Sequence, residues 1–317
     1  MRKIDSLQRY HIFLIVMLFL GDLTKVFAQD PILPATNLGL TNMLDGVAPP
    51  PGIYYQNYTQ NYRADGFSDY KGQKVPGDLT VNYLLSLHQF IYLTNVPVFQ
   101  GNLELTVMLP LVKLSATGNT YKLPAVNTAV AGDITLGGGI QWSDKKLFQK
   151  GFWSRAEIDL TLPSGSWKRK FEINPSAKVY TLSSYYAFTF FLSKKISVSS
   201  RNQINYNFEK DVDNGRAGAF YNVNYSVEYT ILKRLRAEVA GYYLKQLFQD
   251  SFKGNSKYYQ QIMGVADTRE QIFAVGPGLS YQTSHGVFLE AKVFFETAAQ
   301  NRFEGLKPSL RIAIPLL

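Results

Sequence analysis

Hydrophobic and polar residues alternate along much of the chain with a period of two. In RAGAFYNVNYSVEYTI, residues 216–231, Val223 and Tyr225 fall in one row, whereas Asn224 and Glu228 fall in the other. Successive side chains of a β-strand leave opposite faces, so this alternation predicts a strand. A strand of this length far exceeds the usual five or six residues.

The same alternation recurs in about twelve segments, each near the length that crosses a membrane as a strand. They lie near residues 53–63, 82–92, 102–112, 132–142, 153–163, 178–192, 196–209, 216–231, 235–248, 271–282, 286–298 and 303–316. Segments of roughly ten alternating residues separated by turns are typical of outer-membrane barrels. We therefore predict an all-β fold, a transmembrane antiparallel β-barrel of about 12 strands over residues 53–317.

The connections between these segments alternate in length. Short links at 193–195, 232–234 and 283–285 follow even-numbered segments. The links after odd-numbered segments, at 64–81, 113–131, 164–177 and 249–270, are longer, although 210–215 and 299–302 are brief. Outer-membrane barrels have short periplasmic turns and longer external loops, so we predict that both ends of the barrel segment lie on the periplasmic side.

The apolar rows could face either a second sheet or lipid. A sandwich explains the alternation but not strands of fourteen or more residues, whereas a lipid-spanning strand needs about nine to eleven residues and continues past the interface. Tyr favours that interface, and aromatic residues make up 14% of the chain. We expect the apolar rows to face lipid and the polar rows to line the lumen, in the outer membrane of a Gram-negative bacterium.

The N-terminus has the features of a secretory signal peptide over residues 1–28. Arg2, Lys3 and Arg9 precede the apolar run 12–21, and Ala28 ends a small-x-small cleavage site. An uncleaved anchor is the alternative, but a run of about ten apolar residues is short for a membrane helix.

Residues 29–52 are too rich in Pro and Gly to form a strand. One interpretation is a plug that folds into the lumen from the periplasmic side. Its candidate contacts are Leu38, Leu40, Met43 and Leu44. The other interpretation is an extended periplasmic tether.

Charged residues on the polar rows are the candidates for lining the lumen and binding a solute. They are Arg155, Glu157, Asp159, Arg201, Arg216, Glu228, Arg236, Glu238, Glu290, Lys292, Glu296 and Arg311. Such residues either attract and orient a solute, as rings of charge do in channels, or form ion pairs that hold the barrel wall together. A barrel of this size is narrower than the water-filled porins, so both alternatives stay open.

The long connection at 249–270 contains Phe252, Tyr258 and Tyr259, which are candidates for a first contact with an aromatic solute at the outer mouth. Packing against neighbouring loops or lipopolysaccharide is the alternative.

Ser86 and His88 share a face and suggest a lipid hydrolase, but no nucleophile motif accompanies them. We predict no catalytic residues, no metal and no cofactor.

The partners expected from the sequence are outer-membrane lipids and a small solute. The formal net charge is +9, but the basic residues are dispersed, which argues against nucleic acid as a partner. The sequence holds no cysteine, which excludes disulfides. It leaves the oligomeric state open.

The segment GVAPPPGIYYQNYTQNYRADGFSDYKG, residues 46–72, resembles the start of the outer-membrane proteins grouped as the MetA-pathway phenol-degradation family. LTLPSGSW (160–167), NPS (174–176), TLSSYYAFTFF (181–191) and GPGLSY (276–281) are similar as well. The resemblance implies a barrel that admits aromatic and other hydrophobic compounds. The end departs from many outer-membrane barrels, because Pro315, Leu316 and Leu317 stand where an outward aromatic residue is usual.

Three functions remain to be distinguished. The first is a channel or transporter for passive uptake of small hydrophobic or aromatic compounds. The second is a non-conducting structural or binding protein of the outer membrane. The third, a membrane-embedded lipid hydrolase, is the least supported by the residues.

Overall fold

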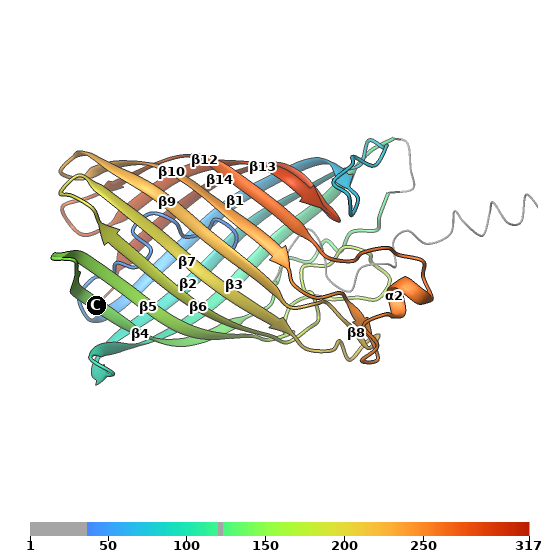
Figure 1. Cartoon of the computed structure of the whole chain (residues 1–317), viewed down its shortest axis with the longest axis horizontal. Coiled ribbons are helices and arrows are strands. Elements are labelled where there is room, and N and C mark those ends of the chain that lie inside the picture. The colour runs from blue at the N-terminus through green and yellow to red at the C-terminus, as the bar shows by residue number, and fades with distance from the viewer. Residues whose placement is uncertain (1–36, 120–122, 317) are drawn as a thin grey trace, which may run out of the picture.

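The protein is a closed antiparallel β-barrel of twelve strands, seen in a computed structural model that describes residues 37–119 and 123–316 (Figure 1). The barrel strands are β1 (Gly52–Ser68), β2 (Thr80–Val98), β3 (Gly101–Thr117), β4 (Thr135–Leu147), β5 (Lys150–Thr161), β6 (Thr181–Phe191), β7 (Ile196–Asn207), β9 (Phe220–Leu232), β10 (Leu235–Gln246), β12 (Gln271–Gln282), β13 (Phe288–Gln300) and β14 (Arg302–Pro315). Each strand pairs with its neighbours in the chain, and β1 closes the barrel on β14. The predicted fold class is confirmed.

The polarity of most of the barrel wall is inverted relative to a soluble protein. On β9 the side chains of Asn222, Asn224 and Glu228 are fully buried inside the barrel, whereas Val227 and Tyr229 are 54% and 47% exposed on its outer surface. The same alternation holds on β5, β13 and β14. Because lipid offers no hydrogen bonds, a closed barrel with an apolar exterior is one of the few folds that satisfies its backbone in a bilayer.

Most short hairpins lie at one end of the barrel and the long loops lie at the other, where the one-residue β13–β14 connection is an exception. The end that carries the C-terminus, at the left of Figure 1, has the tight connections β4–β5, β6–β7 and β9–β10. The other end carries the loop strands β8 (Gly215–Arg216) and β11 (Ser251–Phe252) and the short helix α2 (Tyr258–Gln261). Tyr54 pairs with Pro315, so the barrel begins and ends on the short-hairpin side, as predicted.

The clearest departure from the expected polarity is on β2, although β1 also turns Tyr58, Tyr62 and Ala64 inward. On β2 the inward row contains Leu85, Leu87 and Ile91, so the prediction that the polar row of every strand lines the lumen is wrong here. In NYLLSLHQFIYL, residues 82–93, both rows contain apolar side chains, and a period of two cannot identify the inner one. The register decides the face, because Leu87 pairs with the buried Tyr58 of β1.

Among the described residues, no helix is long and apolar enough to cross a membrane. The predicted signal peptide, residues 1–28, lies outside the described residues, as do residues 29–36 of the predicted plug segment.

Candidate functional site

Most of the segment 37–51 lies inside the barrel, against the wall formed by β4, β6, β9 and β10, whereas residues 49–51 are exposed. The Gly39 amide donates to Asn224 Oδ1 at 3.1 Å, and the Asn42 side-chain amide donates to the Gly241 carbonyl at 2.8 Å. Further along, the Gly46 amide donates to Thr189 Oγ1 at 3.0 Å. These bonds tie the segment to three strands of the wall, so it occupies part of the lumen.

The four candidate plug residues differ in their surroundings. Leu38 packs in a buried cluster with residues of β9, β10, β12 and β13, and Leu40 packs against Tyr58 and Leu87. Met43 is fully buried, whereas Leu44 is half-buried and lines the internal cavity. Their burial inside the barrel gives the segment apolar anchors in addition to its hydrogen bonds.

Asp45 is the one charged residue of this segment, and it meets two arginines of the wall. Arg201 on β7 donates from Nε to Oδ2 at 2.9 Å and from Nη2 to Oδ1 at 2.7 Å. Arg155 on β5 lies 3.4 Å from Oδ1 and donates to the Asp45 carbonyl at 3.2 Å. Arg155 also pairs with Glu104 of β3 at 3.1 Å.

A second ion cluster joins β13 and β14 to the same segment. Glu290 accepts from Lys292 Nζ at 2.8 Å and pairs with Arg311 Nε at 2.8 Å. Lys292 in turn donates to the Leu40 carbonyl at 3.1 Å and to Asn42 Oδ1 at 3.0 Å. The charges of the inner wall thus contact the segment directly.

Most of the predicted lumen residues do lie in the interior. Those on the inner wall are Arg155, Glu157, Asp159, Arg201, Glu228, Arg236, Glu238, Glu290, Lys292, Glu296 and Arg311. Tyr185 donates to Glu157, and Glu296 accepts from Tyr242 at 2.5 Å and from Tyr62 at 2.8 Å.

Arg216 is the exception, and its prediction as a lumen residue is wrong. The barrel strand begins at Phe220, and Arg216 belongs to the short strand β8 in the loop region. Its guanidinium donates to the Tyr206 hydroxyl at 2.9 Å, on the exposed side of that region. The alternation at 216–219 resembles the strand that follows, but those residues pair with no barrel strand.

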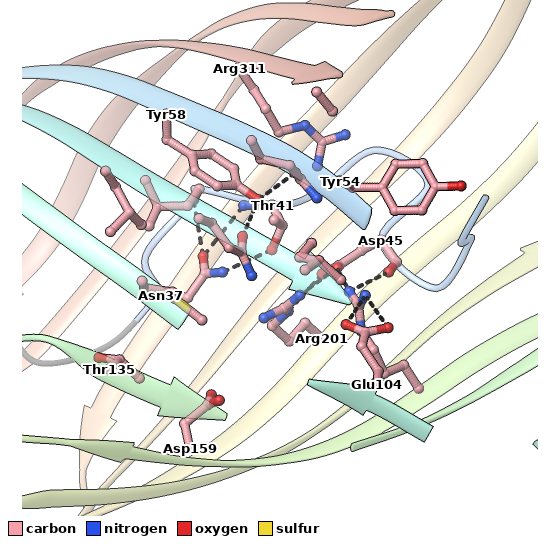
Figure 2. A pocket seen from close by; sticks show the side chains of 18 of the residues that line it. Asn37, Thr41, Asp45, Tyr54, Tyr58, Glu104, Thr135, Asp159, Arg201 and Arg311 are labelled. Carbon is pink, nitrogen blue, oxygen red and sulfur yellow. Dashed lines mark hydrogen bonds and ion pairs between the residues drawn. The ribbon is translucent and has the colours of Figure 1, made fainter. Parts of the chain in front are cut away.

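A cavity of about 630 Å³ remains beside the segment and has two unlike sides. One side is mainly apolar and comes from β2 and β3. Besides Gln89 and Glu104, it consists of Leu85, Leu87, Ile91, Leu93, Met108, Pro110 and Val112. The other side is polar and includes Arg155, Arg201, Gln203 and Arg311. Figure 2 shows Arg201 pointing toward Asp45, with Thr135 and Asp159 on a separate part of the wall.

The cavity lining reaches both ends of the barrel. Asp133 and Pro175 belong to long loops at the long-loop end, whereas Pro50, Gly286 and Pro315 lie at the short-hairpin end. A solute that follows the lining would pass along the apolar side of β2 and β3 and the arginines that hold Asp45.

Asp133 ties two of the outer loops together at the mouth of this cavity. It accepts from the Gly165 amide at 2.9 Å, from Ser176 Oγ at 2.7 Å and from the Ala177 amide at 3.0 Å. Burial raises the pKa of the Asp133 carboxyl, and these hydrogen bonds offset part of the rise.

The aromatic loop residues pack mainly on one another. The rings of Phe252 and Tyr258 stack with centroids 4.4 Å apart, and Tyr258 meets Tyr259 edge-on at 5.4 Å. None of the three lines the cavity. Burial raises the pKa of Tyr259 to about 12.

Ser86 and His88 contact each other through a 3.2 Å hydrogen bond, but on the outer surface of β1 and β2. The other ring nitrogen of His88 bonds to the Tyr55 hydroxyl at 2.7 Å rather than to a carboxylate. Within the described ranges, no group of three or more Asp, Glu or His residues is placed to hold a metal ion.

Sequence reasoning missed three features of the barrel interior. Asp45 and Glu104 were not among the candidates, although both carry a charge into the interior. The buried pair of Arg302 and Glu270, at 2.7 Å, was missed as well. The apolar side of the cavity, formed by β2 and β3, was also missed. The run 82–93 indicated it, because apolar residues occur in both of its rows.

The inverted polarity and the closed strand order define the class of this protein as an outer-membrane β-barrel of a Gram-negative bacterium. The chain belongs to the family described as "Putative MetA-pathway of phenol degradation", which it matches over residues 64–312. The match begins within the 46–72 segment that carried the resemblance. No curated protein matches the chain.

Among solved structures, the chain is similar to the COG4313 outer membrane channel from Pseudomonas putida F1. The TM-score is 0.72 at 14% identity, and the match covers 85% of this chain and 97% of the other. At that identity the likeness shows the fold. The translocator domain of the autotransporter NalP from Neisseria meningitidis matches with a TM-score of 0.43, 7% identity and coverage of 86% and 91%.

Proposed function

We propose that the protein is a passive channel through the outer membrane for small hydrophobic or aromatic compounds. The observation that carries this proposal is the cavity of about 630 Å³, whose lining reaches both ends of the barrel and is apolar along β2 and β3. Membership in a family described by phenol degradation, and the likeness to a barrel described as a channel, support it.

The lining explains why such a solute would be preferred over a sugar. A row of Leu and Ile side chains offers no hydrogen bonds to replace the water that a polyol would lose, and an unpaired hydroxyl costs on the order of 1–3 kcal/mol to bury. An aromatic ring loses no such bonds and gains contact area with the wall. The solute gradient, or consumption of the solute inside the cell, would supply direction.

The proposal is tested by uptake of a hydrophobic dye, N-phenylnaphthylamine, into intact porin-deficient cells whose lipopolysaccharide leaflet excludes it. Cells that express the protein should become fluorescent faster than cells with an empty vector, while uptake of a labelled sugar stays unchanged. Leu87→Asn should slow dye entry by about tenfold, because an amide would replace an apolar part of the path.

Leu87→Met, which keeps volume and polarity, is the matched control and should retain uptake. Equal dye entry with and without the protein would contradict the proposal. It would then favour the second candidate, a non-conducting structural or binding protein. The observation that favours this second candidate is the segment 37–51, which fills part of the lumen and is hydrogen-bonded to the wall.

A further inference from the structure

The carboxylate of Asp45 is bound as a ligand would be bound. Arg201 offers it two nearly parallel hydrogen bonds, at 2.9 and 2.7 Å, from Nε and Nη2. This forked geometry is the strongest way in which arginine recognises a carboxylate. The guanidinium of Arg201 lies 3.9 Å from the centroid of the Tyr185 ring, which fixes its plane.

Asp45 does not belong to the barrel wall, whereas both arginines do. Within 4 Å, Arg201 has no carboxylate partner other than Asp45 among the described residues, while Arg155 also pairs with Glu104 and Glu157. If Asp45 moved away, Arg201 would keep a buried and unpaired charge. Such a charge is costly, so the emptied position would bind another carboxylate that could reach it.

A solute in the cavity can reach this position. Asp45, Arg155 and Arg201 line the same cavity as the apolar residues of β2 and β3. A molecule with an apolar body and one carboxylate would therefore meet a matching surface at each end. Its single negative charge would replace that of Asp45, so the net charge beside the arginines would not change.

We propose that Arg201 and Arg155 form a binding site for an organic monocarboxylate with an apolar body, and that Asp45 fills this site when no solute is bound. The site deepens the proposed function, on which it rests, by naming an acidic subclass of the solutes. Since Asp45 is the one charged residue of the segment 37–51, an acid that displaces it also removes the segment's only ion pairs with the wall.

Binding is measured on the full mature chain in non-ionic detergent, with 4-fluorobenzoate followed by ¹⁹F NMR. The neutral probe is 4-fluorobenzyl alcohol, which has a similar shape and no charge. Asp45→Asn removes the internal competitor and should bind 4-fluorobenzoate at least tenfold more tightly than the parent protein, roughly 1.4 kcal/mol. Arg201→Gln should lose most of the parent protein's affinity for 4-fluorobenzoate. Neither substitution should alter binding of the alcohol.

Thr189→Val is the matched control for a segment that is merely loosened. It removes the hydrogen bond to the Gly46 amide but leaves Asp45 and both arginines in place. Its affinity for 4-fluorobenzoate should stay close to that of the parent protein. The double variant Asp45→Asn/Arg201→Gln removes both charges and should fold without an unpaired arginine, yet bind the acid weakly. Heat-modified migration on gels reports folding of each variant.

The proposed site is wrong if 4-fluorobenzoate binds with the same affinity to the parent protein, to Asp45→Asn and to the double variant. An equal gain for the alcohol in Asp45→Asn would also overturn it, because that gain would reflect space rather than charge. Failure of the dye-uptake experiment, in contrast, would overturn the proposed function while leaving this binding result intact.

Discussion

At the scale of single residues, the lumen is held by charges that satisfy one another away from water. Glu290 sits between Lys292 and Arg311, and all three side chains are almost fully buried. A buried pair adds little over an apolar pair of the same shape, but removing one partner leaves an uncompensated charge. Replacing one of these residues alone should therefore lower the free energy of unfolding by more than the intact cluster contributes to it.

Glu290→Gln tests this reasoning. The variant leaves Lys292 and Arg311 with Glu238 as the remaining carboxyl group of the cluster, so we expect the free energy of unfolding to fall by about 1–3 kcal/mol. Urea unfolding in lipid vesicles, followed by tryptophan fluorescence, measures the change. Arg63→Gln is the control, because the Arg63–Asp65 pair is largely exposed and should contribute less than about 1 kcal/mol. Equal effects would contradict the argument.

At the scale of elements, the sequence predicted all twelve barrel strands because charged, amide and hydroxyl side chains alternate with apolar ones on most of them. It could not identify the inner face of β2, where both rows contain apolar side chains and only pairing with β1 decides. It also could not predict the contact between Asp45 and Arg201. These residues are 156 positions apart, and no local pattern links them.

The glycines of β4 have unequal roles that the sequence does not distinguish. A Cβ at Gly137 would lie 2.2 Å from Asp159 Oδ1 and 2.6 Å from Glu157 Oε1, whereas at Gly138 the nearest atom would be 3.6 Å away. Gly137 therefore makes room for the acidic side chains of β5 inside the barrel.

Gly137→Ala should destabilise the barrel by about 1–3 kcal/mol, because the added methyl group forces those carboxylates to move. Gly138→Ala, one residue away, should change stability by less than about 0.5 kcal/mol. The same urea titration compares the two. A neutral result for Gly137→Ala would show that the side chains of β5 adjust without cost.

The segment 37–51 is the element whose removal should change conduction most. Deleting residues 29–48 frees the part of the lumen that this segment occupies, so single-channel conductance in planar bilayers should rise several-fold. The β1 strand begins at Gly52, so the deletion leaves every barrel strand intact. Unchanged conductance and unchanged dye uptake would mean that the segment does not limit passage.

At the scale of the whole molecule, the fold is a cylinder whose two ends differ. Long loops cap the end with α2, and tight hairpins form the end with the C-terminus (Figure 1). Outer-membrane barrels place their longer loops outside the cell. We therefore expect the long loops of this protein to face outside the cell, and a solute to enter the cavity from that end.

Because the chain has no cysteine, single introduced thiols can report this sidedness without background. Ile262, in the loop between β11 and β12, is 65% exposed, and Phe148, in the β4–β5 hairpin, is 82% exposed. A membrane-impermeant maleimide added to intact cells should label Ile262→Cys and not Phe148→Cys. Permeabilising the outer membrane should make both reactive. Labelling of Phe148→Cys alone in intact cells would mean that the barrel is inserted with its long loops in the periplasm, and the outer mouth of the cavity would then be at the hairpin end.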